Sequence, residues 1–312
     1  MDIAFVGPRA ITVKCLYAAA LFGITALTQT AAMGQGRSAR DYLNAPVDTW
    51  LTTANSVYST SVTPEDGMDI SSRIRTNVFS QTIILTRIMD FGGRTGGISA
   101  IFPYAVANAS TGGSDLSNNG LSDQGAMWQM NLFGGPALRR EQFRSFVAQT
   151  FSSLHVVVLT PTGKYNAASP INPSSNRWTF YPTVNYSWTP DKGATWLELY
   201  LSTKIFSTNG NFGPAGTSSL AQKPLYLAEL HASRNLIRRL WLSGDAYYNV
   251  GGETRINETY QGNAANTVRL GAGSGLRVWR GGEFVLNYEE IVARPSGQPV
   301  SRTYRLKFLQ LW

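Results

Sequence analysis

The sequence predicts an all-β fold, a transmembrane antiparallel β-barrel of about twelve strands that follows a cleaved signal peptide. Three observations predict it. Apolar and polar residues alternate through many long segments, the links between these segments alternate in length, and tryptophans gather near one set of segment ends. A strand turns successive side chains to opposite faces, and about ten tilted residues cross a bilayer.

Residues 1–32 have the features of an export signal. Arg9 and Lys14 supply positive charge, and residues 15–27 form an apolar stretch that is too short to cross a bilayer as a helix. Small residues at 30–32 are a candidate cleavage site. The mature protein is therefore expected outside the cytoplasm.

The exported chain divides into two further parts. Residues 33–48 are expected to form a short periplasmic N-terminal segment, and residues 49–312 the transmembrane barrel. Cys15 is the only cysteine, so the mature chain is predicted to contain no disulfide, thiol nucleophile or cysteine-bound metal.

Alternation with a period of two identifies each strand in turn. In the segment 240–250, for example, Leu242 and Tyr248 fall on one face and Ser243 and Asp245 on the other. Most of these segments are longer than the five or six residues that are usual in soluble proteins. The predicted strands are 49–62, 73–88, 97–108, 121–133, 150–160, 177–189, 194–206, 222–232, 236–250, 266–279, 283–294 and 300–312.

The links between these strands predict which end of the barrel faces the periplasm. The links after the sixth, eighth and tenth strands have 3 or 4 residues, whereas those after the fifth, seventh and ninth have 15 or 16. Outer-membrane barrels have short periplasmic turns and long external loops. The basic segment 134–149 is a long link on the periplasmic side, and the sequence assigns it no role.

Tryptophan placement supports the same orientation. Six of the eight tryptophans lie near predicted periplasmic strand ends, where an aromatic girdle would meet the headgroups. A secreted β-sandwich would explain the alternation but not this sorting. The six are Trp50, Trp188, Trp196, Trp241, Trp279 and Trp312.

The last strand ends on Trp312. A terminal aromatic residue resembles the C-terminal signal that the barrel-assembly machinery of Gram-negative bacteria reads. The expected partners are therefore this machinery, outer-membrane lipid and lipopolysaccharide, and an unidentified small solute. Nucleic acid is not expected, because the formal charge of +8 is scattered along the chain.

The central segment 159–188 resembles an outer-membrane family described as "putative MetA-pathway of phenol degradation". The resemblance rests on a strand that runs into a Pro-Thr-Gly-x-Tyr loop, followed by Asn-x-Trp and another strand. It implies a porin-like channel for the uptake of small solutes, with aromatic or hydrophobic compounds as candidates. The motif residues are Pro161, Thr162, Gly163, Tyr165, Asn176 and Trp178.

Strand parity assigns polar side chains to the lumen, where they would line the path of a solute. On the second strand it points Arg73, Arg75, Asn77 and Gln81 inward. The remaining candidates are Glu198, Tyr200, Lys204, Glu229, His231, Asp245, Tyr247, Arg269, Arg277, Glu289, Arg305 and Lys307.

Two alternatives to a channel stay open at this point. One is a structural or surface-interaction barrel with a blocked lumen. The other is an outer-membrane hydrolase, because His155 follows two serines and His231 shares a face with Glu229. The residues favour no enzyme: no catalytic set, metal-ligand spacing or cofactor motif is evident, so none is predicted.

Overall fold

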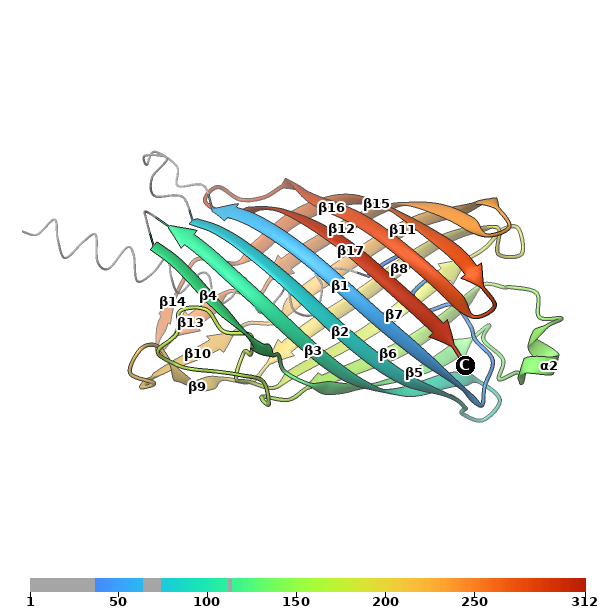
Figure 1. The fold of residues 1–312 in the computed structure, drawn as a ribbon, viewed down its shortest axis with the longest axis horizontal. Helices are drawn as coiled ribbons and strands as arrows, with labels where there is room; N and C mark the ends of the chain where they lie inside the picture. The colour runs from blue at the N-terminus through green and yellow to red at the C-terminus, as the bar shows by residue number, and fades with distance from the viewer. Residues whose placement is uncertain (1–36, 64–73, 112–113) are drawn as a thin grey trace, which may run out of the picture.

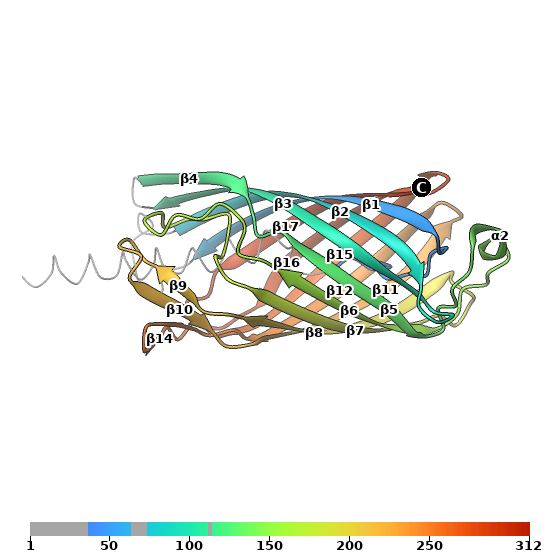
Figure 2. The same cartoon turned by 90° about the horizontal axis from the view of Figure 1, so that it is seen from below.

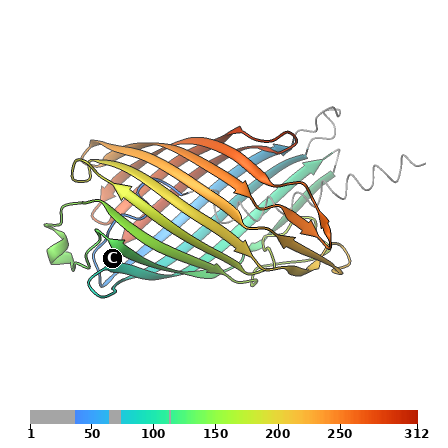
Figure 3. The same ribbon diagram turned by 180° about the vertical axis from the view of Figure 1, so that it is seen from behind.

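The computed structural model describes residues 37–63, 74–111 and 114–312, so the expected signal peptide lies outside the described residues. The described chain forms a closed antiparallel barrel whose strands tilt strongly to its axis (Figures 1 and 3). All twelve predicted strands are confirmed. They are β1 (Thr49–Thr63), β2 (Ile74–Asp90), β3 (Thr95–Thr111), β5 (Gly125–Phe133), β6 (Phe151–Leu159), β7 (Thr179–Trp188), β8 (Thr195–Phe206), β11 (Leu225–Ile237), β12 (Leu240–Gly251), β15 (Ala265–Trp279), β16 (Gly282–Ala293) and β17 (Val300–Leu311).

The barrel closes between its first and last strands. β1 pairs with β17 from Leu51 opposite Leu311 to Val62 opposite Val300. Closure satisfies the backbone groups of both strands, which hydrocarbon could not do. No helix of the described chain is long and apolar enough to span a membrane.

One strand of the wall is interrupted. β3 pairs with β5 over residues 96–101 and with β4 (Ser114–Leu121) over residues 104–111. Residues 122–124 separate β4 from β5, so the predicted strand 121–133 is broken near its start. This break is where a long external loop joins the wall.

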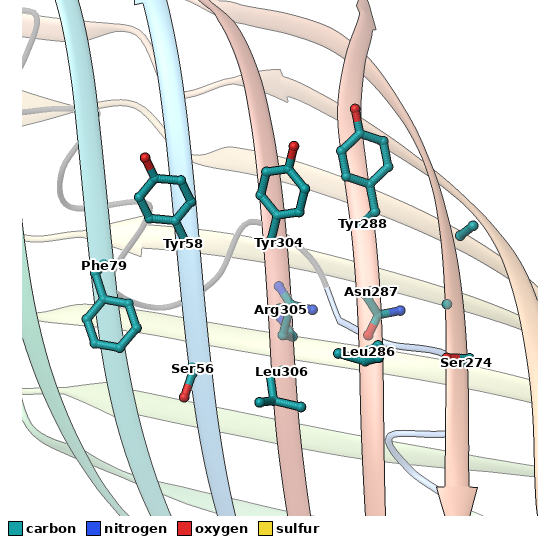
Figure 4. Close-up of a pocket in the computed structure, with 12 residues that line it drawn as sticks. Ser56, Tyr58, Phe79, Ser274, Leu286, Asn287, Tyr288, Tyr304, Arg305 and Leu306 are labelled. Carbon is teal, nitrogen blue, oxygen red and sulfur yellow. The ribbon is translucent and has the colours of Figure 1, made fainter.

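The outer face of the barrel carries an aromatic belt at each end. Figure 4 shows Tyr58, Tyr288 and Tyr304 in a row across neighbouring strands, with their hydroxyls toward the external end and Leu286 and Leu306 below them. At the periplasmic end, four tryptophans are exposed on the outer surface, which places the hydrocarbon band between the two belts. They are Trp50, Trp188, Trp279 and Trp312.

The other two predicted girdle tryptophans do not face lipid. Trp196 and Trp241 lie at periplasmic strand ends, as expected, but both are buried inside the barrel. Trp241 has room there because Gly275 on the neighbouring strand lacks a side chain that would collide with the indole. Strand parity, rather than depth alone, decides which tryptophans reach the lipid.

The parity predicted for β2 is wrong. Arg75, Asn77 and Gln81 lie on the outer face, whereas Thr76 and Ser80 are buried in the lumen. β2 carries large apolar residues on both faces, so its alternation does not define an inner side. The hydroxyl of Tyr58 donates to Asn77 Oδ1 at 3.3 Å, which gives this outward amide a partner. Arg73 lies outside the described residues.

Two long loops build a small sheet beyond the barrel rim. It joins β9 (Asn209–Phe212), β10 (Ser218–Gln222), β13 (Thr254–Ile256) and β14 (Thr259–Tyr260). Figure 2 shows this sheet at the end opposite the short helix α2 (Arg140–Phe143) of segment 134–149. The two ends of the barrel therefore differ in the way the link lengths predict.

The orientation can be tested by cysteine labelling, because the predicted mature chain contains no cysteine. Thr217→Cys and Glu258→Cys lie in the external loops, and both positions are exposed. A membrane-impermeant maleimide should label both on intact cells. Arg238→Cys, in the exposed β11–β12 turn, should label only after the outer membrane is permeabilised. The opposite pattern would invert the topology.

Candidate functional site

The luminal candidates lie where strand parity places them, with one exception. Eleven of the twelve residues outside β2 are buried within the barrel, among them Glu198, Glu229 and Arg305. Arg277 is instead exposed at the periplasmic end of β15, where its Nε lies 3.8 Å from Glu283 Oε2.

Charged luminal residues gather on one wall. Glu289 lies 3.7 Å from Arg269 Nη1 and 3.8 Å from Arg305 Nη2. His231 Nδ1 lies 2.7 Å from Asp245 Oδ1, so Asp245 rather than Glu229 is the nearer carboxylate. These residues belong to the consecutive wall strands β11, β12, β15, β16 and β17, and their charges therefore pair along the wall rather than across the lumen.

The lumen also contains an apolar cluster, which parity analysis of polar residues missed. Its buried members come from β3, β6, β7 and β11, and Ile84 and Met127 pack against them. Such side chains inside a barrel are unusual, because the interior of outer-membrane channels is generally polar. The signal was present in the "VVVL" run of residues 156–159, which is apolar on both faces. The buried members are Ile101, Val157, Leu159, Tyr181, Leu225 and Leu227.

The described part of the expected periplasmic segment lies inside the barrel instead. Arg37 donates from Nη1 to Tyr181 OH at 2.8 Å and from Nη2 to Thr183 Oγ1 at 2.8 Å. Its backbone N–H donates to Glu229 Oε2 at 2.7 Å, and its carbonyl accepts from Tyr247 OH at 3.0 Å. We call residues 37–46 the plug. Nothing in its sequence pattern indicated this position.

A second arginine anchors the plug nearer the periplasmic end of the barrel. The backbone N–H of Arg40 donates to Glu198 Oε2 at 2.7 Å, and its Nε donates to Ser233 Oγ at 2.8 Å. The guanidinium lies 5.0 Å from the centre of the Trp241 ring. Burial lowers the pKa of Arg40 to about 10, against an opposing effect of Glu198, so the side chain stays cationic at neutral pH. This contact gives the inward-facing Trp241 a partner in the plug.

The loop of residues 160–178 covers the external side of the lumen. Asp123, at the break between β4 and β5, accepts from the backbone N–H of Ser175 at 2.8 Å and from its hydroxyl at 2.5 Å. Ser174 Oγ donates to the other carboxylate oxygen. Ile171 is buried against the inner face of β2 and β3. We call residues 160–178 the latch loop.

The motif residues give this loop its shape. A side chain on Gly163 would place its Cβ 2.6 Å from the carbonyl carbon of Ser122, so only glycine allows the loop backbone to pass this close to the wall. Asn176 adopts a positive φ of 51° and donates from Nδ2 to Asn209 Oδ1 at 2.9 Å. Tyr165 OH donates to the carbonyl of Asn211 at 2.9 Å. The motif thus ties the latch loop to the wall and to the external sheet.

The remaining motif residues lie at the edges of the loop. The hydroxyls of Thr160 and Thr162 lie 2.9 Å apart beside Pro161, and Thr162 Oγ1 accepts from the backbone N–H of Gln124 at 3.4 Å. Trp178 is 52% exposed, just before β7 on the outer surface. None of these residues lines the luminal cavity beside the plug.

A cavity of about 190 Å³ lies beside the plug. One side is apolar, with Ile84, Ile101, Met127 and Val157, and the other is charged, with Arg305 among the lining residues. The amphipathic lining suits a small molecule with one polar end.

The histidines do not form a recognisable hydrolase triad in the described residues. Ser153 Oγ lies 2.7 Å from His155 Nε2, but the other ring nitrogen faces Gln129 Oε1 at 3.1 Å rather than a carboxylate. Tyr42 of the plug stacks on the His155 ring with 3.6 Å between centroids. His231 pairs with a carboxylate, but among the described residues no serine or threonine is hydrogen-bonded to its ring.

Solved structures share this architecture. An outer membrane channel from Pseudomonas putida F1 is 17% identical with a TM-score of 0.76, over 89% of this chain and 100% of that chain. The β domain of the Bordetella autotransporter BrkA is 12% identical with a TM-score of 0.54, over 85% and 100%. The transport unit of the autotransporter AIDA-I from Escherichia coli is 11% identical with a TM-score of 0.56, over 93% and 98%. At these identities the likeness establishes the fold alone.

The family comparison is the more specific one. No curated protein matches the chain significantly. A family profile matches residues 50–290, from the first strand to the last but one, and includes the latch loop. With its closed barrel and two aromatic belts, the protein is an integral outer-membrane barrel. The chain belongs to the family described as "putative MetA-pathway of phenol degradation".

Proposed function

We propose that the protein is an outer-membrane channel for the uptake of small, partly hydrophobic solutes. The observation that carries this proposal is the apolar cluster inside the lumen. Ile101 and Val157 of this cluster also line the luminal cavity, and an apolar surface there favours apolar solutes over ions. The family description, with its link to phenol degradation, supports the same solute class.

The plug and the latch loop make this channel a gated one. Each occupies the lumen of a twelve-strand barrel, which is too narrow to be a wide aqueous pore. Passage would therefore require the plug to move. The luminal residues identified from the sequence would line the path once it has moved, with Tyr200 and Tyr247 offering ring faces to a solute.

The test is solute entry into proteoliposomes that contain the full mature chain. Phenol, benzyl alcohol and glucose should be compared by isotope uptake, and we expect the protein to accelerate entry of the aromatic solutes over liposomes without protein. Because small aromatics also cross lipid unaided, the decisive value is the protein-dependent rate. No acceleration of any of them would favour a structural barrel instead.

We propose no enzymatic role. The alternative rests on the Ser153–His155 contact, which is buried beneath Tyr42. Phospholipid and peptide hydrolysis by the folded protein would revive it, provided that Ser153→Ala and His155→Ala abolish the activity without unfolding the barrel.

The remaining inferences from the sequence concern export and assembly. We propose that residues 1–32 are removed during export and that the assembly machinery recognises the C-terminal strand through Trp312. Deleting Trp312 should lower the amount of heat-modifiable, folded barrel in the outer membrane several-fold, while the periplasmic chain remains detectable. Equal amounts of folded barrel would show that Trp312 is not needed for recognition.

A further inference from the structure

The cavity beside the plug has an uneven charge balance. Two of its cations have partners: Arg37 pairs with Glu229, and Lys307 donates to Asp41. Arg305 shares Glu289 with Arg269, so one carboxylate serves two guanidinium groups. In the part of the chain that the structure describes, Arg37, Arg305 and Lys307 line the cavity with a single carboxylate, Asp41, and Lys204 over the Tyr181 ring adds a further cation nearby.

The Arg305 guanidinium is buried but lacks hydrogen-bond partners for two of its nitrogens in the described part of the chain. Its side chain is only 5% exposed, and Nε and Nη2 donate no hydrogen bond within the described residues. Its separation of 3.8 Å from Glu289 is too long for a hydrogen bond. A buried guanidinium normally has its donors occupied, because leaving them without a partner is costly.

The opposite side of the cavity suits a ring. Ile84, Ile101, Met127 and Val157 form its apolar lining, and the volume is about 190 Å³. A cavity of about 150 Å³ with an apolar lining is known to hold benzene. The space beside the plug is therefore large enough for one ring and one small polar substituent.

We propose that this cavity is a binding site for a small aromatic monocarboxylate. The carboxylate pairs with Arg305, whose planar guanidinium matches two carboxylate oxygens, and the ring lies against Ile101, Met127 and Val157. A single negative charge complements this mainly cationic lining. The proposal rests on the proposed function and names the solute class that the channel selects.

The experiment is calorimetric titration of the folded mature protein in detergent with sodium benzoate and with benzyl alcohol at neutral pH. The two probes share a ring and differ in charge, and protein-free micelles provide the blank. Benzoate should bind at least tenfold more tightly. Wild-type protein that binds benzoate no more tightly than benzyl alcohol would overturn the proposal, and this result needs no variant.

Two substitutions on one strand then locate the site. Arg305→Gln removes the luminal charge and should weaken benzoate binding at least tenfold while changing benzyl alcohol binding less than twofold. Arg302→Gln is the matched control, because Arg302 lies on the outer face paired with Glu290 and should change neither. Equal benzoate affinity in a folded Arg305→Gln variant would also overturn the proposal.

Transport separates this inference from the proposed function. If proteoliposomes take up benzyl alcohol but the cavity does not prefer benzoate, the carboxylate site fails and the channel stands. If no solute enters, the channel fails, and the detergent titration alone decides whether the site exists.

Discussion

Replacing Arg37 and Arg40 together by alanine should raise single-channel conductance at least tenfold. Arg37 bonds through its side chain to Tyr181, Thr183 and Glu229, and the Arg40 side chain bonds to Ser233. Hydrogen bonds of a charged group contribute about 1.5–3 kcal/mol each. Losing even about 3 kcal/mol of anchoring would raise the population of the unplugged state about a hundredfold.

The measurement is conductance in planar bilayers, with Arg302→Ala as the control because it removes an arginine from the outer face. A complementary variant should do the reverse. Ser38 Oγ donates to Asn287 Oδ1 at 2.6 Å, so Ser38→Cys with Asn287→Cys offers a crosslink between plug and wall. An oxidised pair should hold the channel closed until reductant is added. Unchanged conductance in both variants would mean that the plug does not gate the lumen.

Asp123→Ala should release the latch loop from the wall. The carboxylate accepts from Ser174, from both donors of Ser175 and from the backbone N–H of Gly163 at 3.3 Å. Removing it leaves these buried donors without an acceptor, at an expected local cost of roughly 3–5 kcal/mol. We expect the barrel itself to persist, because its strand pairing does not depend on this carboxylate.

Proteolysis of intact cells would measure this release. Cleavage within residues 160–178 should become at least tenfold faster in Asp123→Ala, and Asp115→Ala is a control at an exposed position on neighbouring β4. Cleavage at the wild-type rate would show that the remaining contacts of the latch loop are sufficient to hold it.

The sequence alone determined the architecture because the bilayer imposes simple constraints on a barrel. Strand length, closure and alternation follow from the thickness of hydrocarbon and from the need to satisfy every backbone group. These constraints act on neighbouring residues, so segments such as 240–250 show them without any knowledge of distant contacts. The alternation of short and long links was readable for the same reason, because it follows from where the strands end.

The sequence also placed most luminal charges correctly, because an arginine or lysine facing lipid near the midplane would cost about 2–4 kcal/mol. Arg269, Arg305 and Lys307 are examples. It failed on β2, where residues near the headgroups escape this penalty and Arg75 can face outward. It also assigned Trp241 to the outer girdle by depth alone, whereas strand parity turns this side chain inward, where Gly275 leaves room for the indole and Arg40 lies over its ring.

Only the tertiary structure decided what fills the lumen. Arg37 reaches Glu229 across 192 positions of sequence, and Asp123 reaches Ser175 across 52. A periodic pattern reports the faces of one strand, whereas these contacts depend on which strands the barrel brings together around a common axis. The plug, the latch loop and the cavity between apolar and cationic walls therefore have no local signature, since each arises from the closure of the sheet.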